Sequence, residues 1–392
     1  MKAHDLIKSV WIITILALST SVIAAEKPAP VSLTPEGKSG DQFGKGIGMI
    51  RTKILILTTA ILGAAPSPPL LADVSATTET APPLETRCPE VIGEHAVLQQ
   101  GIPVPIWGTS VPGAKVSVRF GGQDKTAVAD GDGRWRVVLD PMKADRLDSL
   151  NKAPKGQTLT IVSELDGEKG IKEFKDVLVG EVWLCSGQSN MAGKVRHNHA
   201  NQDPKDNLLE SNFPAIRHIA APGGWNSAVP GSVGDFTRVG FCFARKVQRE
   251  LKVPIGLVNA STGGSRIESW MRVPPKELPE ADAGKEKVTY GGLYRERIVP
   301  LIGYGMRGAL WYQGEANASE GHSYYLKIQS LIGDWRSSWQ QGDFPFYFVQ
   351  LAGIGRSTVN NPAMGDGRAR IREAQRRALG IKNTGMVVAV DI

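Results

Sequence analysis

The sequence predicts an α/β protein in which a doubly wound, largely parallel sheet follows a small antiparallel β-sandwich. Between residues 88 and 176, short alternating apolar runs are separated by Pro- and Gly-rich turns and lack a helical period, which is typical of a sandwich. From residue 177 onward, short continuous apolar runs alternate with longer helical segments, which is typical of buried parallel strands joined by helices. We therefore expect a β-sandwich domain over 88–176 and an α/β domain over 177–392.

The composition excludes several classes of protein. Hydrophobic residues make up 41% of the 392 residues and charged residues 22%, the range of an ordinary soluble globular chain. The net charge of +7 is modest and the basic residues are scattered, which argues against nucleic-acid binding. The three cysteines, Cys88, Cys185 and Cys242, form neither a disulfide framework nor a zinc motif, although a disulfide between Cys185 and Cys242 stays open. We predict no metal and no cofactor.

Residues 1–72 have the pattern of targeting segments. Residues 1–25 combine lysines, an apolar run and small residues, as a secretory signal does, and a second such segment starts at Met49, a candidate for the true start. Both apolar runs are shorter than the roughly 20 residues of a membrane span, so we expect an exported chain, periplasmic or extracellular, with no stable span. A membrane anchor formed by the first run is the alternative. Pro, Thr and Ala dominate residues 73–87, which predicts a linker.

The expected sandwich contains two hairpin signals. The segment KTAVADGDGRWRVVLD places an Asp/Gly turn at 130–133 between two alternating runs, and QTLTIVSELDGEKGIKEFKDVLVG places another at 166–167. The preceding segment HAVLQQGIPVPIWGTSVPGAKVSVRFGG supplies further short strands. These segments predict an antiparallel sandwich rather than helices.

The α/β part is predicted from its alternating segments. The buried strands are expected in EVWLCSG, PIGLVNAS, RGALWYQGE, FPFYFVQLA and GMVVAVDI. The helices are expected at 239–251, 323–339 and 369–380.

Polar clusters follow three of these strands, at 186–190, 259–265 and 313–317. The carboxyl ends of the strands in a doubly wound sheet meet at one edge, so we expect these clusters to converge on a site. They supply a serine, accessible glycine N–H groups, side-chain amides and a carboxylate, which are the parts of an acyl-transfer site. For each cluster alone, an ordinary Gly-rich turn is the alternative.

The segment VLVGEVWLCSGQSNMAG resembles the nucleophile block of the sialate O-acetylesterase family, among the SGNH-type carbohydrate acetyl esterases. Further stretches fit the family in order from about residue 88 onward: HAVLQQGIPVPIWGTSVPGAKV, NASTGGSRIESWM, GGLYRERIVPLIGYGMRGALWYQGEAN and GDFPFYFVQLA. The resemblance implies an SGNH-like sheet with Ser189 as nucleophile. It also implies an oxyanion hole formed by the N–H of Ser189, the N–H of Gly264 and the side-chain amide of Gln313.

The resemblance implies further roles around this site. Asn190 and Glu315 would support it, and Arg266, Glu268 and Trp270 would lie at its rim or against the substrate. Simple packing is the alternative for Trp270. The implied substrate is an O-acetylated carbohydrate, which would lose its acetyl group through an acyl-serine intermediate without a cofactor.

The sequence departs from the family at the general base, which the family takes from an Asp-x-x-His after the last strand. The histidines are His4, His95, His197, His199, His218 and His322. None of them follows an Asp or Glu by three residues, and Asp391 matches an earlier aspartate of that region. The H-x-H at 197–199 suggests a metal site, but a solvated loop is the favoured interpretation. We therefore expect a copy that is incomplete at its C-terminus and has little activity.

Two other functions stay open. A complete chain would be a non-catalytic carbohydrate-binding protein on an esterase fold. Alternatively, the β-sandwich alone would attach the protein to glycans or to a partner.

Overall fold

The structure, a computed structural model, describes residues 84–197, 207–220, 222–278, 289–318, 320–352 and 367–388. The expected targeting segments, most of the linker, His4, His199 and Asp391 lie outside these residues. Within the described ranges, no helix is both long and apolar enough to cross a membrane.

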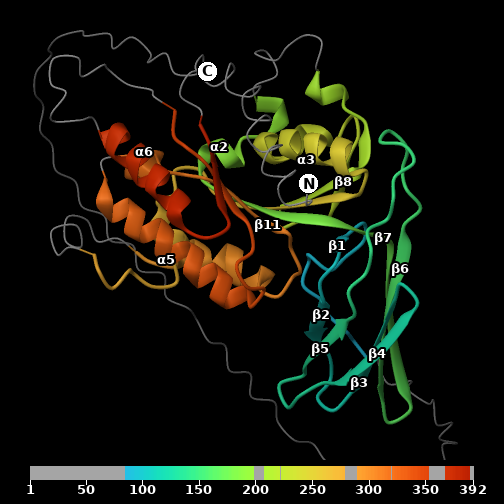
Figure 1. The fold of residues 1–392 in the computed structure, drawn as a ribbon. Coiled ribbons are helices and arrows are strands. Elements are labelled where there is room, and N and C mark those ends of the chain that lie inside the picture. Colours follow the sequence, from blue (N-terminus) through green and yellow to red (C-terminus); the bar gives the residue numbers. More distant parts are fainter. Residues whose placement is uncertain are drawn as a thin grey trace, which may run out of the picture. The chain divides into compact units, whose positions relative to one another are not determined.

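A long strand, β7 (Glu168–Gly187), joins an antiparallel region to a parallel one. Its first half pairs antiparallel with β6 (Gln157–Leu165), and its second half lies between the parallel strands β10 (Ile255–Ser261) and β11 (Gly308–Tyr312) (Figure 1). The second half is continuously buried, as expected of a strand covered on both faces. Because β7 crosses the predicted domain boundary at residue 176 without a break, that boundary stays a prediction.

The parallel sheet has the strand order β13-β12-β11-β7-β10-β8-β9. The strands not yet bounded are β8 (Phe213–Ala220), β9 (Asn226–Ala228), β12 (Phe346–Val349) and β13 (Thr384–Val387). All neighbours in this order are parallel except β8 and β9. After β10 the chain crosses β7 to form β11, so the carboxyl end of β7 lies where the winding direction changes, the usual place for a ligand site. The predicted doubly wound sheet is confirmed, and β8 was not predicted.

The helices are close to their predicted positions. The bounds are α2 (Ser189–Ala192), α3 (Arg238–Leu251), α5 (His322–Trp339) and α6 (Gly367–Arg377). Helix α3 packs against β8 and β10, whereas α5 and α6 pack against each other (Figure 1). The Thr237 side chain accepts a hydrogen bond from the Gly240 N–H and caps α3, which fixes where that helix begins.

The antiparallel region contains two layers of strands. Its strands are β1 (Val97–Gln99), β2 (Val104–Thr109), β3 (Lys115–Phe120), β4 (Gln123–Val128) and β5 (Arg134–Leu139). One layer pairs β4 with β3, β3 with β6 and β6 with β7; the other pairs β2 with β5. Buried and exposed residues alternate along β5, as expected of a strand with one face in a core.

One predicted hairpin is confirmed and the other is wrong. β6 and β7 form the expected hairpin, in which Asp166 and Gly167 both have positive φ, as the tight turn requires. β4 and β5 are joined by the predicted turn at 130–133, but they pair with strands of different layers. The Asp130 side chain accepts hydrogen bonds from the N–H groups of Asp132 and Arg134, and this closed turn carries the chain from one layer to the other.

The disulfide alternative finds no support in the described residues. Cys185 is buried within β7 and forms no disulfide with Cys242. Burial raises the pKa of the Cys185 thiol well above its ordinary value, so the thiol stays protonated and packs as a small apolar group.

Candidate active site

Ser189 lies at a sharp turn between β7 and α2. Gly187 has a φ of 130°, and a Cβ atom there would stand 2.1 Å from the carbonyl oxygen of Tyr312, so the turn requires glycine. The Gln188 N–H donates to the same carbonyl at 2.9 Å and ties the turn to the end of β11. The Ser189 side chain is exposed although its neighbours in β7 are buried. An exposed hydroxyl on a tight strand-to-helix turn is what a nucleophilic serine needs.

The glycine cluster at 259–265 meets this turn from β10. The Thr262 N–H donates to the carbonyl oxygen of Gly187 at 3.0 Å, which places the loop beside the end of β7. Gly263 and Gly264 are exposed, and a Cβ atom on either would meet nothing within 4 Å. Gly264 has a φ of 69°, which an L-residue rarely adopts. The backbone N–H groups of this loop are therefore accessible to an approaching oxyanion.

Gln188 joins the first and third polar clusters. Its Oε1 accepts hydrogen bonds from Gln313 Nε2 at 3.1 Å and from the N–H groups of Gly314 and Ala316 at 3.4 and 3.2 Å. Because a backbone N–H can only donate, these contacts fix which end of the Gln188 amide is the oxygen. Gln188 lies within the predicted serine motif, but nothing in the local sequence indicates its partners, so no role was predicted for it.

Gln313 is fully buried behind Ser189. Besides Gln188, its Nε2 faces the carbonyl oxygen of Ser265 at 3.2 Å and Oδ1 of Asn317 at 2.7 Å, and its Oε1 accepts from the Tyr324 hydroxyl at 2.8 Å. The amide N–H groups are thus directed to protein acceptors in this structure. Gln313 braces the three clusters against one another, and its role as an oxyanion donor stays a prediction.

Asn190 and Glu315 form a pair next to Ser189. Asn190 Nδ2 donates to Glu315 Oε1 at 2.5 Å, while the other carboxylate oxygen is buried and has no hydrogen-bond partner among the described residues. Burial raises the pKa of Glu315, although the hydrogen bond from Asn190 opposes that shift. The predicted contact between the first and third clusters is therefore present.

A buried charge network lies behind the third cluster. Lys327 Nζ contacts Glu268 Oε1 at 2.7 Å and Glu320 Oε2 at 2.6 Å, and Arg266 contacts Glu320 Oε1 at 2.5 Å. Asn317 Nδ2 donates to both carboxylates, at 3.0 and 2.8 Å. Burial alone raises the pKa of Glu268, but hydrogen bonds from Lys327 and Asn317 outweigh burial and hold that pKa below its ordinary value.

Two residues expected at the rim lie inside the protein instead. Glu268 and Trp270 are both fully buried, so neither is a rim side chain. Trp270 donates its indole N–H to Ser265 Oγ at 2.9 Å and packs edge-to-face on Trp311, as the packing alternative predicted. Arg266 is partly exposed, and it also donates to the Ala316 carbonyl oxygen at 2.9 Å.

The contacts of His218 and His95 indicate structural roles. His218 is buried and stacks on Phe236, and burial lowers its pKa to about 3. His95 contacts the Asp176 carboxylate at 2.7 Å, but Asp176 precedes the parallel part of β7, which begins at Leu178 and ends next to Ser189.

The other described histidines also make contacts of their own. His197 Nδ1 accepts from the Lys194 N–H at 3.3 Å, and His322 lies 3.0 Å from the Arg377 guanidinium. Over the residues that the structure describes, no hydrogen bond joins a histidine to Ser189, and no group of His, Cys, Asp and Glu could hold a metal ion.

Known proteins are similar to this chain in sequence. A sequence model of the family described as "Carbohydrate esterase, sialic acid-specific acetylesterase" matches residues 179–392. Human sialate O-acetylesterase is 30% identical over 335 residues, which cover 73% of this chain and 61% of that protein. The mouse sialate O-acetylesterase is 29% identical, with 73% and 64% covered. The chain thus spans less than two thirds of these relatives.

A solved structure has a similar fold. The crystal structure of a carbohydrate acetylesterase from Xanthomonas citri matches with a TM-score of 0.63 and 31% identity, over 78% of this chain and 68% of that one. The predicted α/β fold class is therefore confirmed by the structure and by this neighbour.

Proposed function

Since this chain belongs to the sialic acid-specific acetylesterase family of carbohydrate esterases, we propose that it is an exported serine esterase that removes O-acetyl groups from carbohydrates. The observation that carries the proposal is the exposed Ser189 on its glycine turn, joined to the other two clusters through Gln188 and Thr262. The targeting pattern of residues 1–72 supports export.

The proposed reaction has two steps. Ser189 Oγ bonds to the acetyl carbonyl carbon, and the ester C–O bond breaks as the sugar hydroxyl leaves with a proton. Water then attacks the acyl-serine and releases acetate. The N–H groups of Ser189 and Gly264, with the Gln313 amide once it is redirected, would stabilise the oxyanion, and each such donor typically contributes about 3 kcal/mol.

We place the general base outside the described residues, because the described histidines contact other groups. A serine hydroxyl is almost wholly protonated at neutral pH and is a poor nucleophile without a base. The oxyanion donors alone still provide some rate. If no histidine of the chain reaches Ser189, turnover should be slow and an added small base should accelerate it.

Acetate release by the full chain tests this proposal. The substrates are 4-nitrophenyl acetate and an O-acetylated sialic acid, each measured with and without imidazole. We compare the chain with Ser189→Ala and with a control, Ser337→Ala, which changes an exposed serine on α5. Circular dichroism confirms that each variant is folded.

Slow turnover that rises with imidazole and disappears only in Ser189→Ala supports the proposal. Fast, imidazole-independent turnover that needs Ser189 would show that the chain holds its own base. Turnover that survives Ser189→Ala would refute the nucleophile. A folded chain with no turnover under any condition would favour the carbohydrate-binding alternative.

A further inference from the structure

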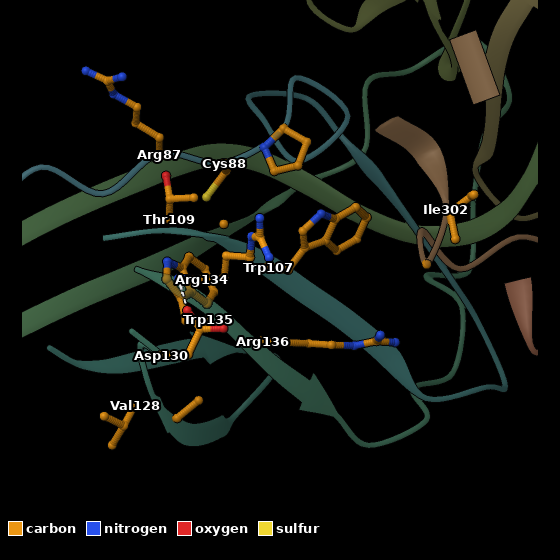
Figure 2. A pocket seen from close by; sticks show the side chains of 14 residues that line it. Arg87, Cys88, Trp107, Thr109, Val128, Asp130, Arg134, Trp135, Arg136 and Ile302 are labelled. Atoms are coloured by element: carbon orange, nitrogen blue, oxygen red, sulfur yellow. Dashed lines mark hydrogen bonds between the residues drawn. The ribbon is translucent and has the colours of Figure 1, made fainter. Parts of the chain in front are cut away.

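A pocket lies in the antiparallel region, and no residue of the Ser189 site lines it. Its volume is about 760 Å³, and its walls come from β2, β4, β5, the segment 87–89 and the loop at 302–303 (Figure 2). A volume of this size accommodates a small ligand. The side chains that line the pocket indicate what that ligand is.

An aromatic ring and a cation stand side by side on one wall. Trp107 of β2 and Arg136 of β5 are directly opposite each other in the antiparallel register, so their side chains share one face. Trp107 is half-buried and packs edge-to-face on Tyr304, whose hydroxyl donates to the Val97 carbonyl oxygen at 2.8 Å. The indole ring is thus held in place while part of it stays accessible.

The pocket carries an excess of positive charge. Arg87, Arg134 and Arg136 line it, against one acidic residue, Asp130 (Figure 2). Arg87 and Arg134 are paired with Glu85 and Asp132, which lie outside the lining, so Arg136 supplies the positive charge that a ligand would meet. Arg136 is exposed and, among the described residues, forms no ion pair or hydrogen bond. A guanidinium without such partners is available to bind a carboxylate through two parallel hydrogen bonds.

We propose that this pocket is a binding site for a carboxylated sugar, separate from the Ser189 site. The Trp107 ring provides an apolar surface for the C–H face of a pyranose, and Arg136 pairs with the carboxylate. In combination with the proposed esterase function, such a site raises the effective concentration of an acidic glycan around the enzyme.

Isothermal titration calorimetry on the full chain tests the site. The probe is the methyl glycoside of sialic acid, which carries no O-acetyl ester, and its methyl ester is the matched uncharged control. All variants are built on Ser189→Ala, so that binding is measured without hydrolysis. The test variants are Trp107→Ala and Arg136→Gln. The control is Arg119→Gln, which removes an exposed arginine on β3 outside the pocket.

We expect the acid to bind, its methyl ester to bind about tenfold more weakly or worse, and Arg136→Gln to abolish that difference. Trp107→Ala should weaken both ligands, and Arg119→Gln should change neither. Acid binding that persists in Trp107→Ala and Arg136→Gln would locate the ligand elsewhere and overturn the proposal. A folded protein that binds neither ligand would overturn it too.

A separate readout distinguishes this proposal from the esterase proposal. Hydrolysis of 4-nitrophenyl acetate in the Ser189 background should be the same with and without Arg136→Gln. Sugar binding without any Ser189-dependent turnover would support this site and refute the esterase.

Discussion

Lys327→Met removes an ammonium group that lies between two buried carboxylates. Lys327 Nζ is 2.7 Å from Glu268 and 2.6 Å from Glu320, and the exposed fractions of the three side chains are 4%, 1% and 13%. Methionine is close to lysine in shape, so the substitution removes the charge while leaving most of the packing in place.

The contacts around Lys327 determine how much unfolding free energy we expect Lys327→Met to remove. Removing one partner of a buried ion pair typically costs 3–5 kcal/mol, because the other charge stays buried without compensation. Glu268 and Glu320 keep their contacts with Asn317 and Arg266, so we expect the lower end, about 3 kcal/mol at pH 7. Replacing Glu268 by Gln in the same chain should recover part of this loss.

Urea unfolding followed by circular dichroism measures the loss. The matched control is Lys125→Met, which breaks an exposed pair with Asp140 and should cost less than about 1 kcal/mol. Because the pKa of Glu268 is held below its ordinary value of 4.5, the wild-type network stabilises the fold above that pH and loses this contribution as the pH falls further. Equal losses for Lys327→Met and Lys125→Met at pH 7 would refute the reasoning.

Three further substitutions test the site itself. Gly187→Ala would place a Cβ 2.1 Å from the Tyr312 carbonyl oxygen, so thermal unfolding should show a loss of about 3 kcal/mol or more; an unchanged melting temperature would contradict the turn geometry. Burial raises the pKa of Glu315, so the stability that its protonated form contributes is lost as the pH rises from 4.5 through the raised pKa. Glu315→Gln should therefore flatten this part of a plot of melting temperature against pH. Parallel plots for the variant and the wild type would exclude this assignment. Gln188→Leu leaves two backbone N–H groups without their acceptor and should cost about 1–3 kcal/mol, with faster hydrogen exchange at Gly314; unchanged exchange there would count against the bracing role.

The sequence predicted the continuously apolar strands of the parallel sheet but missed β8, whose apolar run is interrupted. Strand β8 contains Arg217 and His218, which interrupt its apolar run. In the structure Arg217 is buried because its guanidinium donates to the His95 carbonyl oxygen and contacts Asp176 at 2.7 Å. Those partners are distant in sequence, so no local pattern could show that a charged residue belongs in a buried strand.

The convergence of the three polar clusters was predictable, but the way they are held together was not. The rule that carboxyl strand ends meet at one edge placed the clusters at 186–190, 259–265 and 313–317 together, and the structure confirms this. Lys327 had no role in the prediction because charges on an amphipathic helix are normally solvated. Its burial depends on how α5 packs, which the helical period does not specify. Glu320 lies in the segment before α5, where no pattern indicated a buried charge.

The buried network explains why Gln313 is so firmly placed. Asn317 Oδ1 accepts hydrogen bonds from Gln313 Nε2 at 2.7 Å and from the Ile267 N–H at 3.0 Å, so its Nδ2 must face the carboxylates of Glu268 and Glu320. The hydrogen bonds from Lys327 and Asn317 hold the pKa of Glu268 below its ordinary value, so Glu268 is a charged acceptor for Asn317 near neutral pH. The charge of Lys327 on helix α5 therefore supports the orientation of the Asn317 and Gln313 amides. A substrate that recruits this amide must break contacts that the network stabilises.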